Sequence, residues 1–373
     1  MKVFVTGSDG FVAKNLILRL KERKDIHLVL FNKKNKTSDL LNLLENIDFI
    51  FHFAGVNRSQ NEEDFQNTNV GLTHDLIEAV KKTGCAAPII YTSSIQAELE
   101  NPYGISKKNA ENKLKELNNS KKIQSSIFRL ENVFGKWAKP NYNSAVATFC
   151  NNIAKDLPIE INDPESLINL IYIDDVVEKF IRLIDSVDVL KEYDQVHPKY
   201  QISVGDLASL LYKFKESRDS LITEDVGTGL QRALYSTYLS YLPAKLFSYQ
   251  VKQHTDDRGT FVEMLKTYNS GQFSFFTAHP GITRGGHYHN TKTEKFLVLK
   301  GSAKFKFKNM LDGEYYEIVV NEKDSKIVET IPGWAHDITN IGNSELVVML
   351  WANEIFDHEK ADTYNASLEY ELK

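Results

Sequence analysis

The sequence has little cysteine and no long apolar run. Its 373 residues include only two cysteines, Cys85 and Cys150, far apart in the chain. A disulfide framework is therefore not expected, and a reducing compartment is. No stretch approaches the ~20 consecutive apolar residues that span a bilayer, and the first apolar run is too short for a secretory signal. These absences predict a cytoplasmic protein with no membrane partner.

The sequence also lacks an excess of positive charge. There are 45 Lys and Arg residues against 50 Asp and Glu, which gives a formal net charge of -5. A nucleic-acid-binding surface needs a basic patch, so nucleic acid is not expected as a partner. The chain is 42% hydrophobic and 25% charged, which excludes disorder as its main state. Its length favours two domains over one core.

A glycine-rich turn follows the first apolar run. Residues 3–5 are predicted to form a buried strand, and Gly7 and Gly10 come directly after it. Gly7 permits a tight turn, and Gly10 lets the backbone approach a diphosphate. Phe11 and Val12 then open a helix, whose N-terminal N–H groups and dipole favour phosphate. We expect a dinucleotide site here, with an ordinary structural turn as the alternative.

The residues that end the next two predicted strands indicate which cofactor binds and whether it has room. A strand that selects NAD usually ends in Asp or Glu, which holds the ribose 2′-hydroxyl. Here Asn32, Lys33 and Lys34 follow Phe31 instead, and the lysines can meet a 2′-phosphate. We predict NADPH, although an ordinary solvated loop is nearly as good an account of the lysines. Ala54 ends the following strand with a side chain small enough to let a cofactor lie across it.

Tyr103 and Lys107 form the candidate acid–base pair. Pro102 suits the first turn of a helix, which places Tyr103 and Lys107 one turn apart on one face. An ammonium next to a phenol favours the phenolate and lowers the phenol pKa. The preceding strand ends in Ser93 and Ser94, and either hydroxyl can hold a substrate oxygen. The order of glycine turn, serine strand and Tyr–Lys helix predicts carbonyl reduction or oxidation.

These motifs resemble the extended short-chain dehydrogenase/reductase family, which acts on nucleotide sugars. The stretches 129–135 and 172–176 agree with it. The resemblance implies a doubly wound Rossmann-type sheet, with Tyr103 and Lys107 catalytic, Ser94 as the serine, Lys107 also at the cofactor and Asn132 at the substrate. The sugar dehydratases of that family carry an acid soon after the serine. Here Gln96 lies in that region, so dehydration is disfavoured.

A polar and aromatic loop covers residues 136–144. Lys136 and Lys139 supply charge, and Trp137 and Tyr142 supply rings. The loop can grip a uracil or a diphosphate, or it can be an ordinary surface loop. The sequence favours neither.

Beyond residue 243 the composition changes to short β-rich runs separated by Gly and Asn turns, which predicts an all-β sandwich or barrel. His287 and His289 are two apart, so they face one side of a strand. Glu294 and His336 complete a set suited to a divalent metal, with zinc as first choice. The alternative is a group of half-buried polar strand residues.

This region resembles the cupins, which have a jelly-roll fold. Residues 281–301 match the first cupin motif throughout, and residues 332–340 match the second in part. The stretch 255–263 resembles the entry of the deoxysugar 3,5-epimerase cupins, which implies that Arg258 meets a nucleotide diphosphate. We therefore divide the chain into a reductase domain, 1–243, and a metal-binding cupin domain, 244–373.

The whole chain resembles the bifunctional CapF/WbjC family of capsule and O-antigen synthesis. The resemblance lies in residues 101–104, 134–137, 139–144, 147–150, 234–243 and 294–298. It implies a homodimer that epimerises a UDP-2-acetamido-2,6-dideoxy-hexos-4-ulose at C3 on the cupin metal. NADPH then reduces C4 to give UDP-2-acetamido-2,6-dideoxy-β-L-talose, on the route to UDP-N-acetyl-L-fucosamine.

Two rivals to this interpretation stay open. In one, the protein only reduces a sugar and the cupin is a structural or dimerisation module. In the other, it is a nucleotide-sugar sensor without catalysis. The base that moves the proton at the cupin is also open among His279, Asp256, Tyr288 and Lys300.

Overall fold

The computed structural model describes residues 1–119, 123–186, 190–247, 249–290, 292–310, 312–359 and 361–368. They form two compact units. Unit 1 contains residues 1–211 and 233–243, and unit 2 contains residues 212–232 and 244–373. The segment 212–232 thus groups with unit 2, although our division of the sequence placed it in the first domain. The division at residue 243 as a boundary between independently folding domains stays a prediction.

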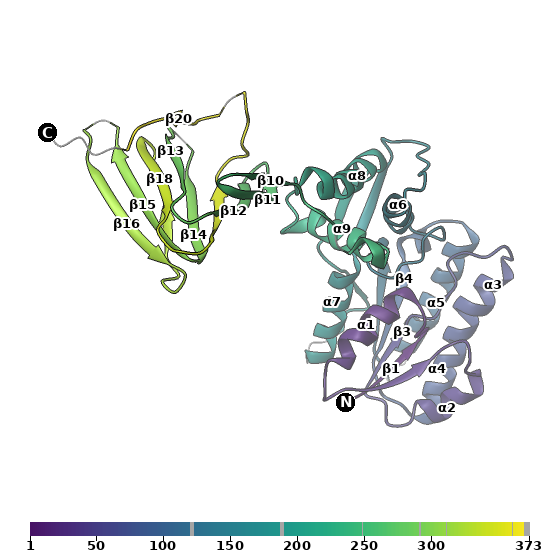
Figure 1. Ribbon diagram of the computed structural model, residues 1–373. Coiled ribbons are helices and arrows are strands. Elements are labelled where there is room, and N and C mark those ends of the chain that lie inside the picture. Colours follow the sequence, from purple (N-terminus) through teal and green to yellow (C-terminus); the bar gives the residue numbers. More distant parts are fainter. Residues whose placement is uncertain are drawn as a thin grey trace. The chain divides into compact units, whose positions relative to one another are not determined.

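Unit 1 is built on a parallel sheet in the order β2-β1-β3-β4-β5-β8, of which Figure 1 labels β1, β3 and β4. The strands are β1 (Lys2–Thr6), β2 (His27–Phe31), β3 (Phe49–His52), β4 (Ile89–Ser94), β5 (Ser125–Leu130) and β8 (Tyr193–Asp194). A smaller sheet joins β6 (Asn132–Phe134), β7 (Leu167–Tyr172) and β9 (Tyr200–Ser203). The strand order reverses at β1, and ligands of open α/β sheets bind at such a switch point.

Apolar strands and helix faces make the core of unit 1. β3 is buried along its whole length, and Val3, Phe4 and Val5 of β1 are fully buried. Strands that are buried on both faces appear in a sequence as continuous apolar runs, and such runs predicted these strands.

The longer helices of the chain are α1 (Phe11–Lys21), α4 (Leu72–Thr83), α5 (Pro102–Asn119), α6 (Ala145–Ala154), α7 (Ile173–Asp185), α8 (Val204–Ser220) and α9 (Gly229–Ser240). Shorter ones are α2 (Leu40–Leu43) and α3 (Glu63–Phe65), and a π-helix at Gln66–Gly71 leads into α4.

Unit 2 is a sandwich of two sheets, in the orders β10-β11-β12-β19-β14-β17 and β16-β15-β18-β13-β20. All pairs within them are antiparallel. The strands are β10 (Gln253–Asp256), β11 (Gly259–Thr267), β12 (Gly271–Ala278), β13 (Thr283–Tyr288), β14 (Glu294–Lys300), β15 (Ser302–Asn309), β16 (Tyr315–Asn321), β17 (Ile327–Glu329), β18 (Trp334–Asn340), β19 (Leu346–Ala352) and β20 (Tyr364–Asn365).

Aromatic and branched residues of both sheets fill the sandwich, among them Phe276, Phe296 and Phe305. The predicted fold class, a Rossmann-type parallel sheet followed by an all-β cupin, is confirmed. None of the helices in the described part of the chain is long and apolar enough to cross a bilayer.

Candidate active sites

The glycine turn lies where β1 and β3 meet at the switch point. Gly7 has a φ of 63°, and a Cβ on it would lie 2.7 Å from the Ala54 Cα, so only glycine fits. The Gly10 N–H donates to the Gly7 carbonyl over 2.8 Å, and Gly10 caps α1 without a side chain. Phe11 and Val12 therefore open the helix directly behind the turn. This geometry fits a diphosphate at the helix N-terminus.

The end of β2 presents an amide where an NAD site usually has an acid. Asn32 accepts a hydrogen bond from the Lys34 N–H on its side chain, over 2.9 Å. Its own N–H donates to the Asn35 side chain, also over 2.9 Å. These bonds hold a turn on which Lys33 and Lys34 are exposed. The turn is compatible with a 2′-phosphate, and the choice of NADPH stays a prediction.

Helix α5 brings the predicted catalytic residues of unit 1 together. Burial raises the pKa of Tyr103, and hydrogen bonding with the Ser94 hydroxyl opposes this rise. Lys107 is buried, and its Nζ donates to the Thr92 carbonyl over 2.9 Å. The same Nζ lies 4.7 Å from the centre of the Tyr91 ring. The three side chains thus come from β4 and one face of α5.

One electrostatic expectation at this site was wrong. We expected the Lys107 ammonium to lower the Tyr103 pKa, but burial outweighs the other contributions and raises it. Burial also lowers the pKa of Lys107 to about 8, against the opposing pull of the Glu111 charge. The site therefore favours a neutral phenol, the form that can donate a proton to a substrate oxygen.

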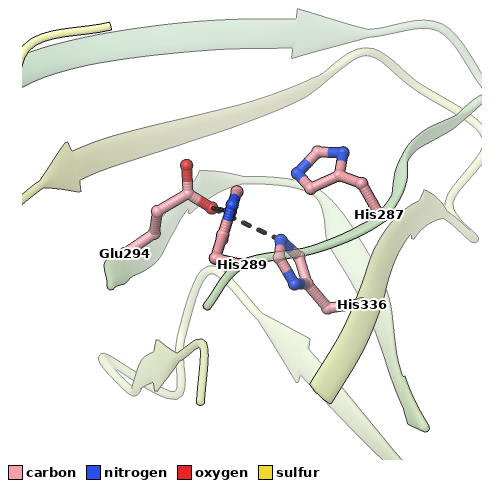
Figure 2. A group of neighbouring side chains, drawn as sticks. All are labelled: His287, His289, Glu294 and His336. Atoms are coloured by element: carbon pink, nitrogen blue, oxygen red, sulfur yellow. Dashed lines mark hydrogen bonds and ion pairs between the residues drawn. The ribbon is translucent and has the colours of Figure 1, made fainter. Parts of the chain in front are cut away.

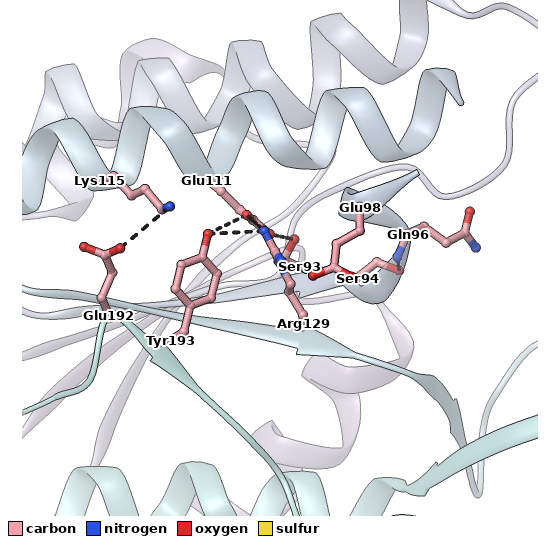
Figure 3. Close-up of polar contacts among 9 residues, drawn as sticks. All are labelled: Ser93, Ser94, Gln96, Glu98, Glu111, Lys115, Arg129, Glu192 and Tyr193. Carbon is pink, nitrogen blue, oxygen red and sulfur yellow. Dashed lines mark hydrogen bonds and ion pairs between the residues drawn. The ribbon is translucent and has the colours of Figure 1, made fainter. Parts of the chain in front are cut away.

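The choice between the two serines follows from their partners. Ser93 is buried and donates to Glu111 Oε1 over 2.6 Å (Figure 3). Ser94 accepts the Gln96 N–H over 3.2 Å and faces Tyr103. Successive residues of a strand point to opposite faces, so both cannot serve the same site. These contacts favour Ser94, as the resemblance implied.

Glu111 anchors a buried polar network that the sequence did not single out. Its fully buried carboxylate accepts hydrogen bonds from Arg129 Nε and Nη2 over 2.9 and 2.7 Å. Tyr193 also donates to it, over 2.7 Å, and Ser93 completes the set (Figure 3). Burial would raise the pKa of Glu111, but these bonds lower it. Glu111 lies one turn beyond Lys107, a spacing that could have flagged it.

A second missed network joins the glycine turn to α5. Buried His52 contacts Thr6 Oγ1 over 2.7 Å and Thr73 Oγ1 over 2.9 Å, and burial lowers its pKa to about 3. Asn69, on the π-helix, donates to Ser106 Oγ over 2.9 Å, and Ser106 donates to the Tyr103 carbonyl. The cofactor turn and the catalytic helix are thus held by side-chain hydrogen bonds.

The predicted substrate loop is partly engaged with the chain itself. Lys136 forms an ion pair with Asp174 over 2.7 Å, and Tyr142 exchanges hydrogen bonds with Arg58. Trp137 is half-exposed with a φ of 71°. Asn132 is exposed on β6 and donates to the Asn169 carbonyl over 3.0 Å. A role in substrate binding stays a prediction for these residues.

In unit 2 the four predicted metal ligands converge. One candidate ligand atom from each of His287, His289, Glu294 and His336 lies within 4.8 Å of the others. Figure 2 shows the side chains pointing toward one another from β13, β14 and β18 and from the residue that follows β13. Glu294 Oε2 lies 3.3 Å from Nε2 of both His289 and His336. Three imidazoles and a carboxylate suit zinc and related divalent ions.

The chemistry of this cluster fits a metal better than a hydrogen-bonded core. His336 is buried, and its Nδ1 makes no hydrogen bond with a residue that the structure describes, while its Nε2 faces the Glu294 carboxylate over 3.3 Å. Buried polar atoms without a partner are costly, so a ligand for them is expected. Burial lowers the pKa of His287 to about 4, which keeps its imidazole neutral. Burial alone would raise the pKa of Glu294, but contacts with His289 and His336 lower it strongly.

Two arginines of unit 2 are candidates to contact an anionic group: Arg258, which follows β10, and Arg284, which lies on β13. Arg258 is exposed and pairs with Asp256 over 2.6 Å. Arg284, which the sequence did not single out, donates to the Thr277 carbonyl over 3.1 Å and lies 5.2 Å from the Phe276 ring centre. Burial is the main cause that lowers the Arg284 pKa, and the positive charge of Arg258 lowers it further. The predicted diphosphate contact of Arg258 stays a prediction.

Comparison with known proteins now assigns the family. A curated protein of Pseudomonas aeruginosa, "UDP-2-acetamido-2,6-beta-L-arabino-hexul-4-ose reductase", is 58% identical over 99% of both chains. The crystal structure of the capsular polysaccharide assembling protein CapF from Staphylococcus aureus is 38% identical, with a TM-score of 0.91 over 98% of this chain and all of that one. The chain belongs to the CapF family.

Further matches agree with the two units of this CapF-family chain. Residues 3–197 match the NAD dependent epimerase/dehydratase family, and residues 254–364 match the polysaccharide biosynthesis C-terminal domain. A UDP-glucuronic acid 4-epimerase from Bacillus cereus with bound NAD is 20% identical, with a TM-score of 0.57 over 66% of this chain. That likeness concerns the fold alone. The family match over residues 3–197, and not this likeness, supports a nicotinamide cofactor in the first unit.

Proposed function

We propose that the protein is a bifunctional nucleotide-sugar enzyme. It epimerises a UDP-2-acetamido-2,6-dideoxy-hexos-4-ulose at C3 in the cupin and then reduces C4 with NADPH. The product is UDP-2-acetamido-2,6-dideoxy-β-L-talose, for capsule or O-antigen synthesis. One observation carries the proposal: a Tyr–Lys–Ser site and a four-ligand cluster are both complete in one chain. The name of the Pseudomonas relative supports the 4-keto substrate and the reduction.

In the reductase site each side chain has a separate task. The neutral Tyr103 hydroxyl donates a proton to O4 as hydride reaches C4, because a buried phenol keeps its proton. Ser94 holds the same oxygen and orients the phenol. Lys107 would help to hold the cofactor, and its positive charge would stabilise the phenolate left behind. Gly7, Gly10 and Ala54 leave room for the cofactor, and Lys33 favours NADPH over NADH.

In the cupin site His287, His289, Glu294 and His336 hold a divalent cation, for which zinc is the best fit. Bound there, the cation stabilises negative charge that develops on the keto oxygen when the C3 proton leaves. Arg258 takes the diphosphate. Among the four candidate bases, Asp256 is weakened because its hydrogen bonds with Arg258 lower its pKa to about 2. Tyr288, His279 and Lys300 stay candidates.

The proposal is tested by product analysis. The protein is incubated with UDP-N-acetylglucosamine, the 4,6-dehydratase for that sugar, and NADPH, and the product is examined by NMR. We expect NADPH oxidation and the L-talo product. Reduction without inversion at C3 would favour the rival in which the cupin is only structural, and no NADPH oxidation would favour the sensor. A homodimer and a cytoplasmic location are also proposed, for light scattering and cell fractionation to test.

A further inference from the structure

The segment 361–368 lies against the strand that carries the first metal ligand. β20 pairs with β13, with His287 opposite Asn365 and Tyr288 opposite Tyr364 (Figure 1). The Ala366 N–H donates to the Gly286 carbonyl over 3.0 Å. The rings of Tyr288 and Tyr364 stack with their centres 5.3 Å apart. Leu368 is buried, so the segment is also anchored at this end.

One residue of this segment makes two kinds of contact next to His289. The Asp362 carbonyl accepts a hydrogen bond from His289 Nδ1, across 73 positions of sequence. The Asp362 carboxylate accepts the backbone N–H groups of Asn290 and Lys292, each over 2.9 Å. Asp362 therefore binds both the His289 ring, through its carbonyl, and the backbone that follows His289, through its carboxylate.

The carbonyl contact fixes which nitrogen of His289 is free. A carbonyl oxygen has no proton to give, so the hydrogen must lie on Nδ1. Nε2 then has its lone pair available, and it is the nitrogen that faces Glu294 Oε2, 3.3 Å away. Such outer hydrogen bonds fix the tautomer and ring orientation of metal-binding histidines. His336 contrasts with His289, because neither of its nitrogens has such a partner among the described residues.

We propose that Asp362 is a positioning residue of the metal centre, and that docking of the segment 361–368 sets the affinity for the metal. The inference rests on the proposed metal site of the cupin. The carbonyl orients His289, and the carboxylate holds that carbonyl in place by capping Asn290 and Lys292. Lys292 strengthens the attachment, because its Nζ also donates to Thr363 Oγ1 over 3.3 Å.

The test compares zinc affinity by competition with a chromophoric chelator. Asp362→Ala removes the two caps, and we expect zinc to bind about 10-fold to 100-fold more weakly than in the unchanged protein. Asp362→Asn keeps one acceptor oxygen and should lose less. Asp357→Ala is the matched control, because among the described residues the Asp357 carboxylate caps a nearby N–H, that of Glu359, over 2.9 Å. Its affinity should equal that of the unchanged protein.

A second measurement reports the tautomer of His289 directly. Nitrogen-15 NMR of the metal-free protein reports which nitrogen of each histidine carries the proton. We expect His289 in the Nδ1–H form, and Asp362→Ala should mix the two tautomers. Stoichiometric zinc in the unchanged protein, with equal affinity in Asp362→Ala, would overturn this inference and leave the proposed function standing. No zinc binding by the unchanged protein would instead defeat the metal site itself.

Discussion

The polar groups of the reductase site are hydrogen-bonded to the rest of the chain, whereas those of the metal cluster mainly face one another. Lys107 donates to Thr92, and Ser94 contacts both Gln96 and Tyr103. In the cupin, His336 Nδ1 has no hydrogen bond to any residue that the structure describes, and His336 Nε2 faces Glu294 Oε2 over 3.3 Å. The first site is organised by the protein before substrate binds. We propose that the second is organised for an ion, with His289 as a ligand whose ring is held in advance by a backbone carbonyl.

The two units also place their chemistry differently. In unit 1 the functional groups gather where parallel strands end, so loops and helix starts supply them. In unit 2 three of the ligands stand on antiparallel strands and His289 directly follows β13, and the alternation of side chains points them to one space. A variant in one site should therefore leave the other activity intact, and the predictions below test that separation.

The largest effect is expected at Tyr103. Tyr103→Phe removes the proton donor and should reduce NADPH oxidation about a thousandfold, within the range for general acid catalysis. The metal content of the cupin should not change. Stopped-flow absorbance of NADPH and elemental analysis measure the two quantities. A loss of less than tenfold would mean that another group protonates O4.

The second-largest effect is expected on stability, when the buried carboxylate of Glu111 loses its partner Arg129. Arg129→Met leaves this carboxylate without its cation, and we expect the free energy of unfolding to fall by about 3–5 kcal/mol. Arg182→Met is the control, since Arg182 pairs with Glu178 at the exposed surface and should cost less than about 1 kcal/mol. Urea denaturation measures both. Equal losses in the two variants would show that the network does not stabilise unit 1.

The pH dependence of cofactor binding follows from Lys107. Its pKa of about 8 means that the ammonium is present below that pH and is lost above it. NADPH affinity should therefore be constant below about pH 8 and fall up to tenfold per pH unit above it. The Lys107→Met variant should bind NADPH weakly, and its NADPH affinity should change little across the same pH range. Fluorescence titration from pH 6.5 to 9.5 measures this, and a flat profile for the unchanged protein would contradict it.

Cofactor selection should show the smallest effect. Lys33→Glu places an acid beside the predicted 2′-phosphate and should shift the preference from NADPH toward NADH about tenfold, or about 1.4 kcal/mol. Lys21→Glu, an exposed lysine at the far end of α1, is the charge-matched control. The ratio of kcat/KM for the two cofactors is the readout. A preference for NADH in the unchanged protein would refute the assignment.

The sequence was most informative where one residue type is required by geometry. Gly7 has to be glycine because of its φ and its approach to Ala54, so the turn was found from the pattern. His287 and His289 were found from strand alternation. The register that brings His336 opposite His287 was not predictable, because pairing between β13 and β18 depends on the whole sandwich.

Contacts between residues far apart in sequence account for what was missed. Glu111, His52 and Asp362 act through partners on other elements, and none belongs to a short motif. The Tyr103 pKa was assigned the wrong direction because spacing on a helix gives distance to Lys107 but not burial. The grouping of residues 212–232 with unit 2 likewise depends on hydrogen bonds such as Lys266 N–H to the Leu221 carbonyl.

The separation of the two activities is tested most directly by deuterium exchange into C3 of the 4-keto sugar in D₂O, without NADPH, followed by proton NMR. We predict exchange by the unchanged protein and by Tyr103→Phe. We predict at least about a hundredfold less with His289→Ala, in which the metal should also be lost. His254→Ala, an exposed histidine on β10, should behave as the unchanged protein. Exchange that persists in His289→Ala, or that disappears in Tyr103→Phe, would contradict a separate epimerase site in the cupin.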